Sequence, residues 1–446
     1  MIKISKGLNL PITGNPYQTI DRTITPKRVA VLGNDYEGMK PTMLVKVGDN
    51  VLKGDPLFED KKNPGVHFTS PASGTVIEVN RGAKRVLESV VVEVNGTGAK
   101  SFKKFDASAF ATLSAEDVEQ NLLDSGMWAA LRRRPYSKIP AVGSRPIALF
   151  VTAMDTNPLA PSVNLAIETY KDAFRDGLEV LSRLAPKVHV CKGPKGELPL
   201  PKASNIEETV FSGPHPAGLA GTHIHFLEPV DSKRIVWTIN YADVIAIGKL
   251  FTTGELFTER VVSVAGPASI YPVVVKTHMG ASCDELTAGN QNPGENRVIS
   301  GSVFSGRKAS GAEAYLGRYH LQVCILEEGR KRELMGWQLP GVNKFSVKRS
   351  YVGGWFPWKN HDFTTDTNGS ERAIVPIGVY EKVMPQDTEP TFLARSLLSQ
   401  DVDLAESLGA LEMDEEDLGL MSFVCPGKHE YGALLRNLLT MHEKEG

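Results

Sequence analysis

Cysteine is scarce in this sequence, and the cysteines that it has lie far apart. No two of them form a CxxC pair, whereas zinc sites and iron–sulfur clusters are held by closely spaced cysteines. The sequence therefore predicts independent, reduced thiols and no cysteine-ligated metal centre. The 446 residues contain four cysteines: Cys191, Cys283, Cys324 and Cys425.

Long apolar runs are also missing. No stretch approaches the roughly 18 uninterrupted apolar residues that a membrane-spanning helix needs. The longest apolar region, Ile235 to Phe251, is interrupted by Asn240, Asp243 and Lys249, and it indicates a buried helix or strand. The segment Met1 to Tyr17 lacks the basic and apolar parts of an export signal. We therefore expect a chain that is neither exported nor membrane-spanning.

Neither sign of charge dominates. Lys and Arg number 50 against 52 Asp and Glu, which gives a formal net charge of -2. Such a balance provides no overall field to attract nucleic acid or an anionic membrane. With 41% hydrophobic and 23% charged residues the composition is that of a folded protein. We expect no nucleic-acid partner.

The common catalytic and nucleotide-binding motifs are absent as well. The sequence has no G-x-G-x-x-G or Walker A loop, no G-x-S-x-G and no HExxH. Without such glycines, backbone N–H groups cannot closely approach a pyrophosphate. The residues alone therefore identify no catalytic residue, no metal site and no bound redox centre, and they indicate a multidomain scaffold or an electron-transfer accessory.

The pattern along the chain predicts a multidomain α/β protein, since 446 residues correspond to about three domains at roughly 150 residues each. Short alternating runs separated by Gly, Pro and Asp indicate a small β unit near the N-terminus. Alternating strand and helix patterns then indicate an α/β layer, which is followed by a strand-rich unit and a helical tail. The predicted segments are 1–33, packing on a later domain; 34–101, a β domain; 102–255, a Rossmann-like α/β domain; 256–330, a β-grasp (ubiquitin-like) domain; and 331–446, a mainly helical domain.

Several local signals support the α/β assignment. Ser114 and Asp117 predict the start of a helix that ends near Gly126. Ser162 is predicted to cap a second helix that continues through Phe174 to Leu184 at the 3.6-residue period. Buried-type strands are expected at 146–153, 187–191 and 208–213.

The β unit resembles the biotinyl/lipoyl carrier hammerhead. Val45 to Leu57 and Ser70 to Val79 match the "VKVGDxVxxGxxL" and "SPxSGxVxxV" patterns of that fold. In carriers, a lysine at the hairpin tip between the two halves is acylated, and Lys61 and Lys62 lie near this place. Two interpretations stay open, a solvated turn or a modified carrier lysine.

Gly126 to Pro146 form a strongly basic stretch that contains no acidic residue. One interpretation is a loop that holds an anionic group or a polar quinone ring through guanidinium and tyrosyl donors. The alternative is a solvated or subunit-contacting face. The basic and aromatic residues concerned are Arg132, Arg133, Arg134, Lys138, Arg145, Trp128 and Tyr136.

Two further clusters each have two interpretations. His215, His223 and His225 form a three-ligand metal site if 223–225 is a strand, or bond to backbone carbonyls if Gly213–Pro216 is a rigid loop that enters a helix. The run Asp401 to Asp417 holds eight carboxylates and no basic residue. We interpret it as an amphipathic acidic surface rather than a cation site.

Five stretches, in this order, resemble the NqrA family, whose members are subunits of the bacterial sodium-translocating NADH:quinone oxidoreductases. They are "MIKISKGLNLPITGNP", "TSPASGTV", "SGMWAALRRRPYSKIP", "GPHPAGLAGTHIHF" and "VISGSVFSGRKASG". The family is related to the RnfC subunit of the Rnf complex and to the flavin-binding subunit of complex I, whose loop after the first helix is glycine-rich and cradles FMN. Here Leu131, Arg132 and Arg133 occupy that region, and Cys425 stands alone where the relatives hold an iron–sulfur cluster. The resemblance thus implies a chain that binds no redox cofactor covalently or tightly.

The resemblance implies a peripheral subunit on the cytoplasmic face of the bacterial inner membrane, in a complex that transfers electrons from NADH to ubiquinone and exports Na⁺. Flavins, the iron–sulfur centre and the NADH site are then expected on sister subunits, membrane subunits are expected partners, and the isolated chain is expected to be inactive. The alternatives are a purely structural assembly subunit or a stand-alone carrier-like scaffold. Ubiquinone is the implied ligand, and the residues implied to lie near it are Gly33, Tyr36, Arg132, Arg133, Tyr136 and Lys138.

Overall fold

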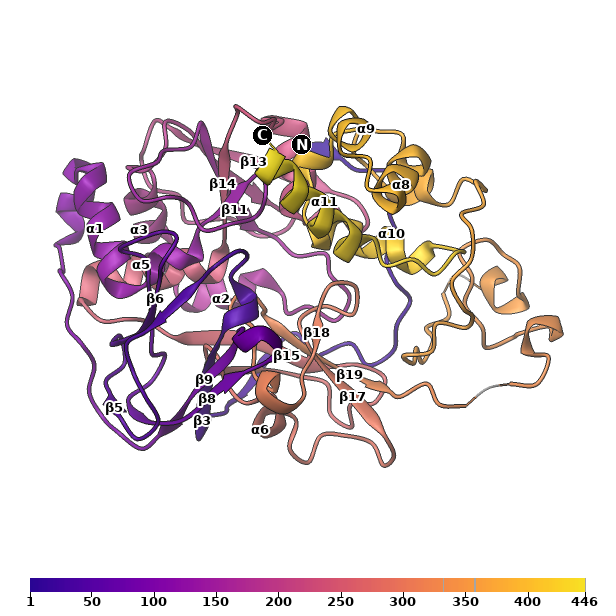
Figure 1. Ribbon diagram of the computed structural model, residues 1–446, viewed down its shortest axis with the longest axis horizontal. Coiled ribbons are helices and arrows are strands. Elements are labelled where there is room, and N and C mark those ends of the chain that lie inside the picture. The colour runs from indigo at the N-terminus through magenta and orange to yellow at the C-terminus, as the bar shows by residue number, and fades with distance from the viewer. Residues whose placement is uncertain (332, 357, 446) are drawn as a thin grey trace.

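A computed structural model describes residues 1–331, 333–356 and 358–445 of the chain (Figure 1). Its α/β layer is a six-stranded sheet in which all neighbouring strands run parallel except the β14–β10 pair at one edge. The three strands predicted for this layer are confirmed. In spatial order the sheet is β1 (Ile2–Lys3), β13 (Ile206–Ser212), β12 (Val188–Lys192), β11 (Ala148–Ala153), β14 (Val236–Asn240) and β10 (Arg132–Arg134).

Helices cover both faces of this sheet. Successive side chains of a strand point to opposite faces, so alternate residues of one strand pack into two different cores. Leu149 and Val151 of β11 join the core that contains α3 (Lys171–Leu181) and α5 (Tyr241–Thr253). Ala148 and Phe150 of the same strand face a second core that contains Ile224 of α4 (Ala220–Leu227).

The predicted helix from Ser162 onward is in fact two helices. It is interrupted at Tyr170 between α2 (Val163–Thr169) and α3, and the Ser162 side chain makes no capping hydrogen bond. The apolar period therefore predicts the buried face from Phe174 onward correctly, but the helix that carries this face starts later than predicted.

The close crossing of α3 and α5 needs a glycine, since a Cβ on Gly248 would lie 1.9 Å from the Ala173 carbonyl oxygen.

The first predicted helix is confirmed as α1 (Ala115–Ser125), where Ser114 Oγ accepts a hydrogen bond from the Asp117 amide at 3.0 Å. It ends at Gly126, whose φ of 76° is in the left-handed region that favours glycine. A 3₁₀ turn over Met127–Ala130 then leads into edge strand β10. Arg132, Arg133 and Arg134 therefore form the edge strand of the α/β sheet.

The N-terminal β unit consists of two small sheets, and Lys61 and Lys62 lie in the turn that joins β6 to β7. Lys62 Nζ donates to the Gly38 carbonyl at 2.9 Å. Strand β3 belongs to this unit, although it falls within the segment 1–33. One sheet contains β3 (Arg28–Leu32), β9 (Leu87–Val94), β8 (Gly74–Arg81) and β5 (Asn50–Val51), and the other β4 (Pro41–Met43), β6 (Pro56–Asp60) and β7 (His67–Thr69).

A fourth, mixed sheet holds the strands expected between residues 256 and 330. The N-terminal segment contributes to it as well, because β2 pairs in parallel with β16, while β1 pairs with β13 of the α/β sheet. The short helix α6 (Cys283–Thr287) follows β16. The strand order is β18 (Arg307–Lys308), β17 (Asn296–Ser300), β19 (Gln322–Glu327), β15 (Glu259–Ala265), β16 (Val273–His278) and β2 (Ile20–Thr23).

The C-terminal helices have a hydrophobic core of their own. The segment before them contains 3₁₀ turns at Gly336–Gln338 and Val352–Trp355. Among the described residues, no helix is both long and apolar enough to cross a membrane. The helices are α7 (Tyr380–Val383), α8 (Pro390–Ser399), α9 (Val402–Ser407), α10 (Gly419–Val424) and α11 (Tyr431–Glu445), drawn in orange to yellow in Figure 1.

Candidate functional site

The two sequence segments predicted to lie near a quinone, 33–38 and 132–138, meet in the structure. A Cβ on Gly38 would lie 2.9 Å from the Lys138 side chain. Tyr319, which the sequence did not single out, links the segments at their other end. Its ring centroid is 6.4 Å from that of Tyr36 and 5.0 Å from the Arg132 guanidinium carbon.

Gly33 and Tyr36 are both buried. A Cβ on Gly33 would lie 2.1 Å from the Leu87 carbonyl oxygen, so this position requires glycine for close packing. Tyr36 is 7% exposed and its ring centroid is 4.3 Å from that of Phe68. Burial raises the pKa of Tyr36 well above its usual value. Tyr36 therefore stays a neutral phenol that packs against Tyr319.

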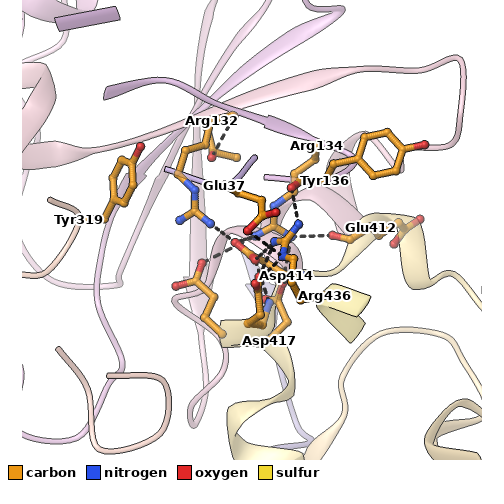
Figure 2. Close-up of polar contacts among 12 residues, drawn as sticks. Glu37, Arg132, Arg134, Tyr136, Tyr319, Glu412, Asp414, Asp417 and Arg436 are labelled. Carbon is orange, nitrogen blue, oxygen red and sulfur yellow. Dashed lines mark hydrogen bonds and ion pairs between the residues drawn. The ribbon is translucent and has the colours of Figure 1, made fainter. Parts of the chain in front are cut away.

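The helices and turns of residues 380–445 are called the C-terminal unit below. The arginines of β10 are paired with carboxylates of this unit (Figure 2). Arg134 is 1% exposed, and its Nη1 lies 2.8 Å from the Glu412 carbonyl oxygen and 3.0 Å from Asp417 Oδ2. Its Nη2 lies 3.3 Å from Asp414 Oδ2, an atom that Arg132 also contacts. The interpretation of the basic run as a solvated face is therefore wrong for Arg134.

Arg436 of α11 completes this cluster. Its Nε and Nη2 each lie 2.6 Å from a carboxylate oxygen of Glu415, in a bidentate pair. Nη2 also reaches Asp414 Oδ1 at 3.3 Å, and Nη1 donates to the Tyr136 carbonyl at 2.7 Å. Asp414 thus accepts from arginines of two distant parts of the chain.

The acidic run was predicted to be a surface, and this is wrong for its last part. Asp414 and Asp417 are 1% and 3% exposed. Burial by itself would raise the pKa of Asp414, but Arg132 and Arg134 outweigh it and hold the pKa well below the usual range. Asp414 is therefore ionised at neutral pH. The acidic and basic runs neutralise each other inside the protein.

Arg133, Tyr136 and Lys138 contact residues of α11, and these contacts are more exposed than those of Arg134. Arg133 Nη2 lies 3.2 Å from Glu443 Oε1, and Lys138 also pairs with Glu443. The Tyr136 hydroxyl lies 2.9 Å from His442 Nδ1. The four loop residues predicted near the quinone thus all contact the C-terminal unit.

A cleft of ≈ 140 Å³ lies at the carboxyl end of the parallel strands. The chain leaves β11 toward β12 on one side and later returns to β14 on the other side, so the strand order reverses between β11 and β14. Open α/β sheets bind ligands at such a reversal, beyond the carboxyl ends of the strands. Of the predicted residues, Arg132 lines this cleft. Other lining residues are Thr152, Asp155, Asn240, Tyr319 and Glu416.

Sequence reasoning missed the residues of the cleft other than Arg132. Asp155 carried a usable signal, since it follows a buried strand at the edge where α/β sheets bind ligands. Tyr319 and Glu416 carried none, because they come from a connecting loop of the fourth sheet and from the C-terminal unit.

The three histidines do not face one another as ligands in a strand would. His223 lies in helix α4, and its Nε2 is 3.0 Å from the Ala217 carbonyl oxygen. His215 Nδ1 is 3.2 Å from Thr156 Oγ1, and His225 Nδ1 is 2.7 Å from Glu412 Oε2. The predicted loop that enters a helix is confirmed, but only His223 bonds to a backbone carbonyl, whereas His215 and His225 bond to side chains. Within the described residues, no group of three His, Cys, Asp or Glu side chains is arranged to hold a metal ion.

Three family models match the chain. They are described as the NqrA N-terminal barrel-sandwich hybrid domain, over residues 2–95, the NqrA second alpha/beta domain, over 113–256, and the NQRA C-terminal domain, over 261–311. The chain is 59% identical to the NqrA subunit of the Na(+)-translocating NADH-quinone reductase of Vibrio alginolyticus, and 60% identical to that of Vibrio vulnificus strain YJ016. Its identity to the corresponding subunit from Shewanella amazonensis is 56%. Each alignment covers 100% of both chains.

Among solved structures, an NAD⁺-reducing [NiFe]-hydrogenase in the air-oxidised state matches with 13% identity and a TM-score of 0.36, over 52% of each chain.

Proposed function

We propose a quinone-binding role for this chain, which belongs to the NqrA family of Na(+)-translocating NADH-quinone reductase subunits. As a member it is part of that oxidoreductase complex, and the other subunits are its partners. The observation that carries the quinone role is the cleft at the strand-order reversal, which Arg132 and Tyr319 line. The bound group is the ring of ubiquinone.

The size of the cleft suits one ring. An engineered cavity of about 150 Å³ takes benzene, and this cleft has ≈ 140 Å³. A quinone also needs hydrogen-bond donors for its carbonyl oxygens. Arg132 Nη2 is held by Asp414, while no hydrogen bond to another described residue engages Arg132 Nε or Nη1. These N–H groups are the donors that we assign to a quinone carbonyl.

The other residues predicted near the quinone do not line the cleft themselves. Tyr36 packs on Tyr319, and the Tyr36 amide donates to the Gly33 carbonyl oxygen at 3.3 Å. The quinone-proximal residues in this proposal are Gly33, Tyr36, Arg132, Arg133, Tyr136 and Lys138.

The test compares Arg132→Met with Arg145→Met in the intact complex. Arg145 comes from the same basic stretch but pairs with Glu119 at 2.7 Å, and it is the matched control. A hydrogen bond to a charged group contributes about 1.5–3 kcal/mol, so we expect Arg132→Met to raise the KM for ubiquinone-1 by about tenfold or more. Equal KM values in the two variants would refute the role of the cleft.

We also propose that the chain carries no tightly bound redox cofactor and that the flavins, the iron–sulfur centre and the NADH site reside on sister subunits. Leu131, which occupies the place of the relatives' glycines, is fully buried, and this supports the proposal because a packed side chain there leaves no room for a flavin phosphate. A visible spectrum of the purified full-length chain tests it. A stoichiometric flavin absorbance band would contradict it.

The parts of the fold receive finer interpretations. We infer a hammerhead related to biotinyl/lipoyl carriers for 34–101, a Rossmann-like domain for 102–255, a β-grasp domain for 256–330 and a helical domain for 331–446. The parallel strands with helices on both faces support the second of these. Intact-mass measurement tests whether Lys61 or Lys62 is modified.

An assembly role is the second candidate, and one surface favours it. The described residues between 334 and 356, together with Trp358, expose large apolar side chains, with Trp355 at 63% and Trp358 at 77% exposure. Exposed aromatic residues of this kind are typical of protein interfaces. We assign this surface to contact with the membrane subunits, and we propose that the chain lies on the cytoplasmic face of the inner membrane. If Trp355→Ala/Trp358→Ala leaves co-purification with the membrane subunits unchanged, this assignment is wrong.

A further inference from the structure

The reduction of a quinone to a hydroquinone consumes two protons as well as two electrons. The electrons come from NADH through the complex, as the family's activity provides. The protons must reach two ring oxygen atoms of a quinone held in the cleft. A cleft that serves this reaction therefore needs proton donors in its wall.

Two carboxyl groups line the same cleft from different parts of the chain. Asp155 lies in the loop that follows β11, at the carboxyl end of the sheet. Glu416 lies in the 3₁₀ turn Glu415–Leu418 of the C-terminal unit. The two carboxyl groups therefore meet at the cleft from separate elements of the fold.

Hydrogen bonds fix one carboxyl oxygen of Asp155 and leave the other available to carry a proton. Its Oδ1 accepts from both the amide and the Nδ2 of Asn157, at 2.8 and 3.0 Å, which fixes the carboxyl group. No hydrogen bond from a described residue reaches its Oδ2. Burial raises the pKa of Asp155 to about 6, and the Asn157 hydrogen bonds oppose this only in part. The titratable group that faces it is Tyr241, whose own pKa is raised by burial and by Asp155.

Glu416 combines partial burial with access to water. Its side chain is 33% exposed, and Oε1 lies 3.7 Å from Arg134 Nη2. Burial raises its pKa, Arg132 and Arg134 oppose this, and the neighbouring Asp414 and Asp417 raise it further, to about 7. A group of this kind holds a proton near neutral pH and regains it from solvent.

Asp414 belongs to the same network of charges, but its pKa is lowered whereas that of Glu416 is raised. Arg132 and Arg134 keep it ionised, so it neutralises the arginines and releases no proton. Carboxyl groups whose environments drive their pKa values apart divide the roles of charge partner and acid. The cleft shows this division between Asp414 and Glu416.

We propose that Asp155 and Glu416 deliver the two protons of quinone reduction to the two ring oxygen atoms in this cleft. In each transfer a carboxyl O–H bond breaks, its electron pair stays on the carboxylate, and an O–H bond forms on the ring oxygen as the two electrons arrive. Each carboxylate then regains a proton from water. This inference rests on the proposed quinone role.

The test uses intact complexes that carry Asp155→Asn, Glu416→Gln, or both. Glu415→Gln is the matched control, because this adjacent carboxylate pairs with Arg436 and does not line the cleft. The readouts are kcat with ubiquinone-1 across pH, the Kd for ubiquinone-1, and the reduction of ferricyanide, which accepts electrons without protons.

General acid catalysis contributes about 10²–10⁴-fold, so we expect the double variant to lose about 10²-fold in kcat with ubiquinone-1, with unchanged Kd and unchanged ferricyanide reduction. The wild-type kcat should fall as the pH rises above about 6, because Asp155 and then Glu416 lose their protons, and Glu416→Gln should flatten the later part of this decline. Glu416→Asp keeps an acid and should retain most of the rate.

Two results would overturn the inference. One is a double variant with wild-type kcat, and the other is an equal loss of ferricyanide reduction, which would assign the two carboxyl groups to folding. Either outcome with a normal Kd leaves the quinone role standing. Failure of the quinone role itself is distinct, because wild type and Arg132→Met would then bind ubiquinone-1 equally weakly.

Discussion

Replacing Arg134 by methionine should destabilise the C-terminal unit strongly. The side chain is 1% exposed and faces Asp414 and Asp417, whose side chains are 2% and 1% exposed. The variant leaves two carboxyl groups buried with fewer cations, while methionine keeps most of the volume. Removing one partner of a buried ion pair typically costs 3–5 kcal/mol. We therefore expect a loss of about 3–5 kcal/mol at pH 7.

The matched control is the neighbouring Arg133. Its side chain is 26% exposed and pairs with Glu443 at 3.2 Å, and exposed pairs of this kind contribute about 0–1 kcal/mol. Urea unfolding of the full-length chain, followed by fluorescence and by protease sensitivity of the C-terminal helices, gives the two values. Similar losses in Arg133→Met and Arg134→Met would refute the reasoning.

The pH dependence provides an independent check. The folded-state pKa of Asp414 is depressed, so its contribution to stability is present above its unfolded pKa of about 3.9 and is lost as the pH falls through the folded value. The wild-type chain should thus lose stability in acid. Arg134→Met should lose less there, and the difference between the two should shrink as the pH falls from 7 toward 3. A difference that stays constant over this range would contradict the role of buried charge.

Three further substitutions test the packing around the site. Gly221→Ala should weaken docking of the C-terminal unit by about 1–3 kcal/mol, because the new Cβ would lie 2.3 Å from Asp417 Oδ2, and the midpoint of urea unfolding measures it. Gly248→Ala should cost at least as much, since its Cβ would lie 1.9 Å from the Ala173 carbonyl oxygen, a backbone atom that cannot rotate away; an unchanged melting temperature would contradict this. Ser114→Ala removes the side-chain cap of α1 and should cost about 1 kcal/mol, which amide hydrogen exchange in the first turn of that helix can detect.

The local patterns of the sequence were sufficient for most elements because hydrophobic periodicity and capping act over a few residues. The strands at 146–153 and 187–191 and the helix after Ser114 form where predicted. The break at Tyr170 was missed, since the apolar period continues across it in the sequence. The resemblance in five stretches was sufficient to identify the family, which full-length identities near 60% confirm.

The sequence by itself thus determined the order of elements, the absence of common cofactor motifs and the two segments that meet at the site. Only the tertiary structure decided which basic residues pair with which acidic residues. Arg134 and Asp417 are 283 residues apart in the chain, and no local pattern records which acidic run neutralises which basic run. The cleft has the same origin, since strands β11 and β14, a loop of the fourth sheet and a turn of the C-terminal unit each supply part of its wall. Burial, which sets the charge states there, depends on all of these elements packing together.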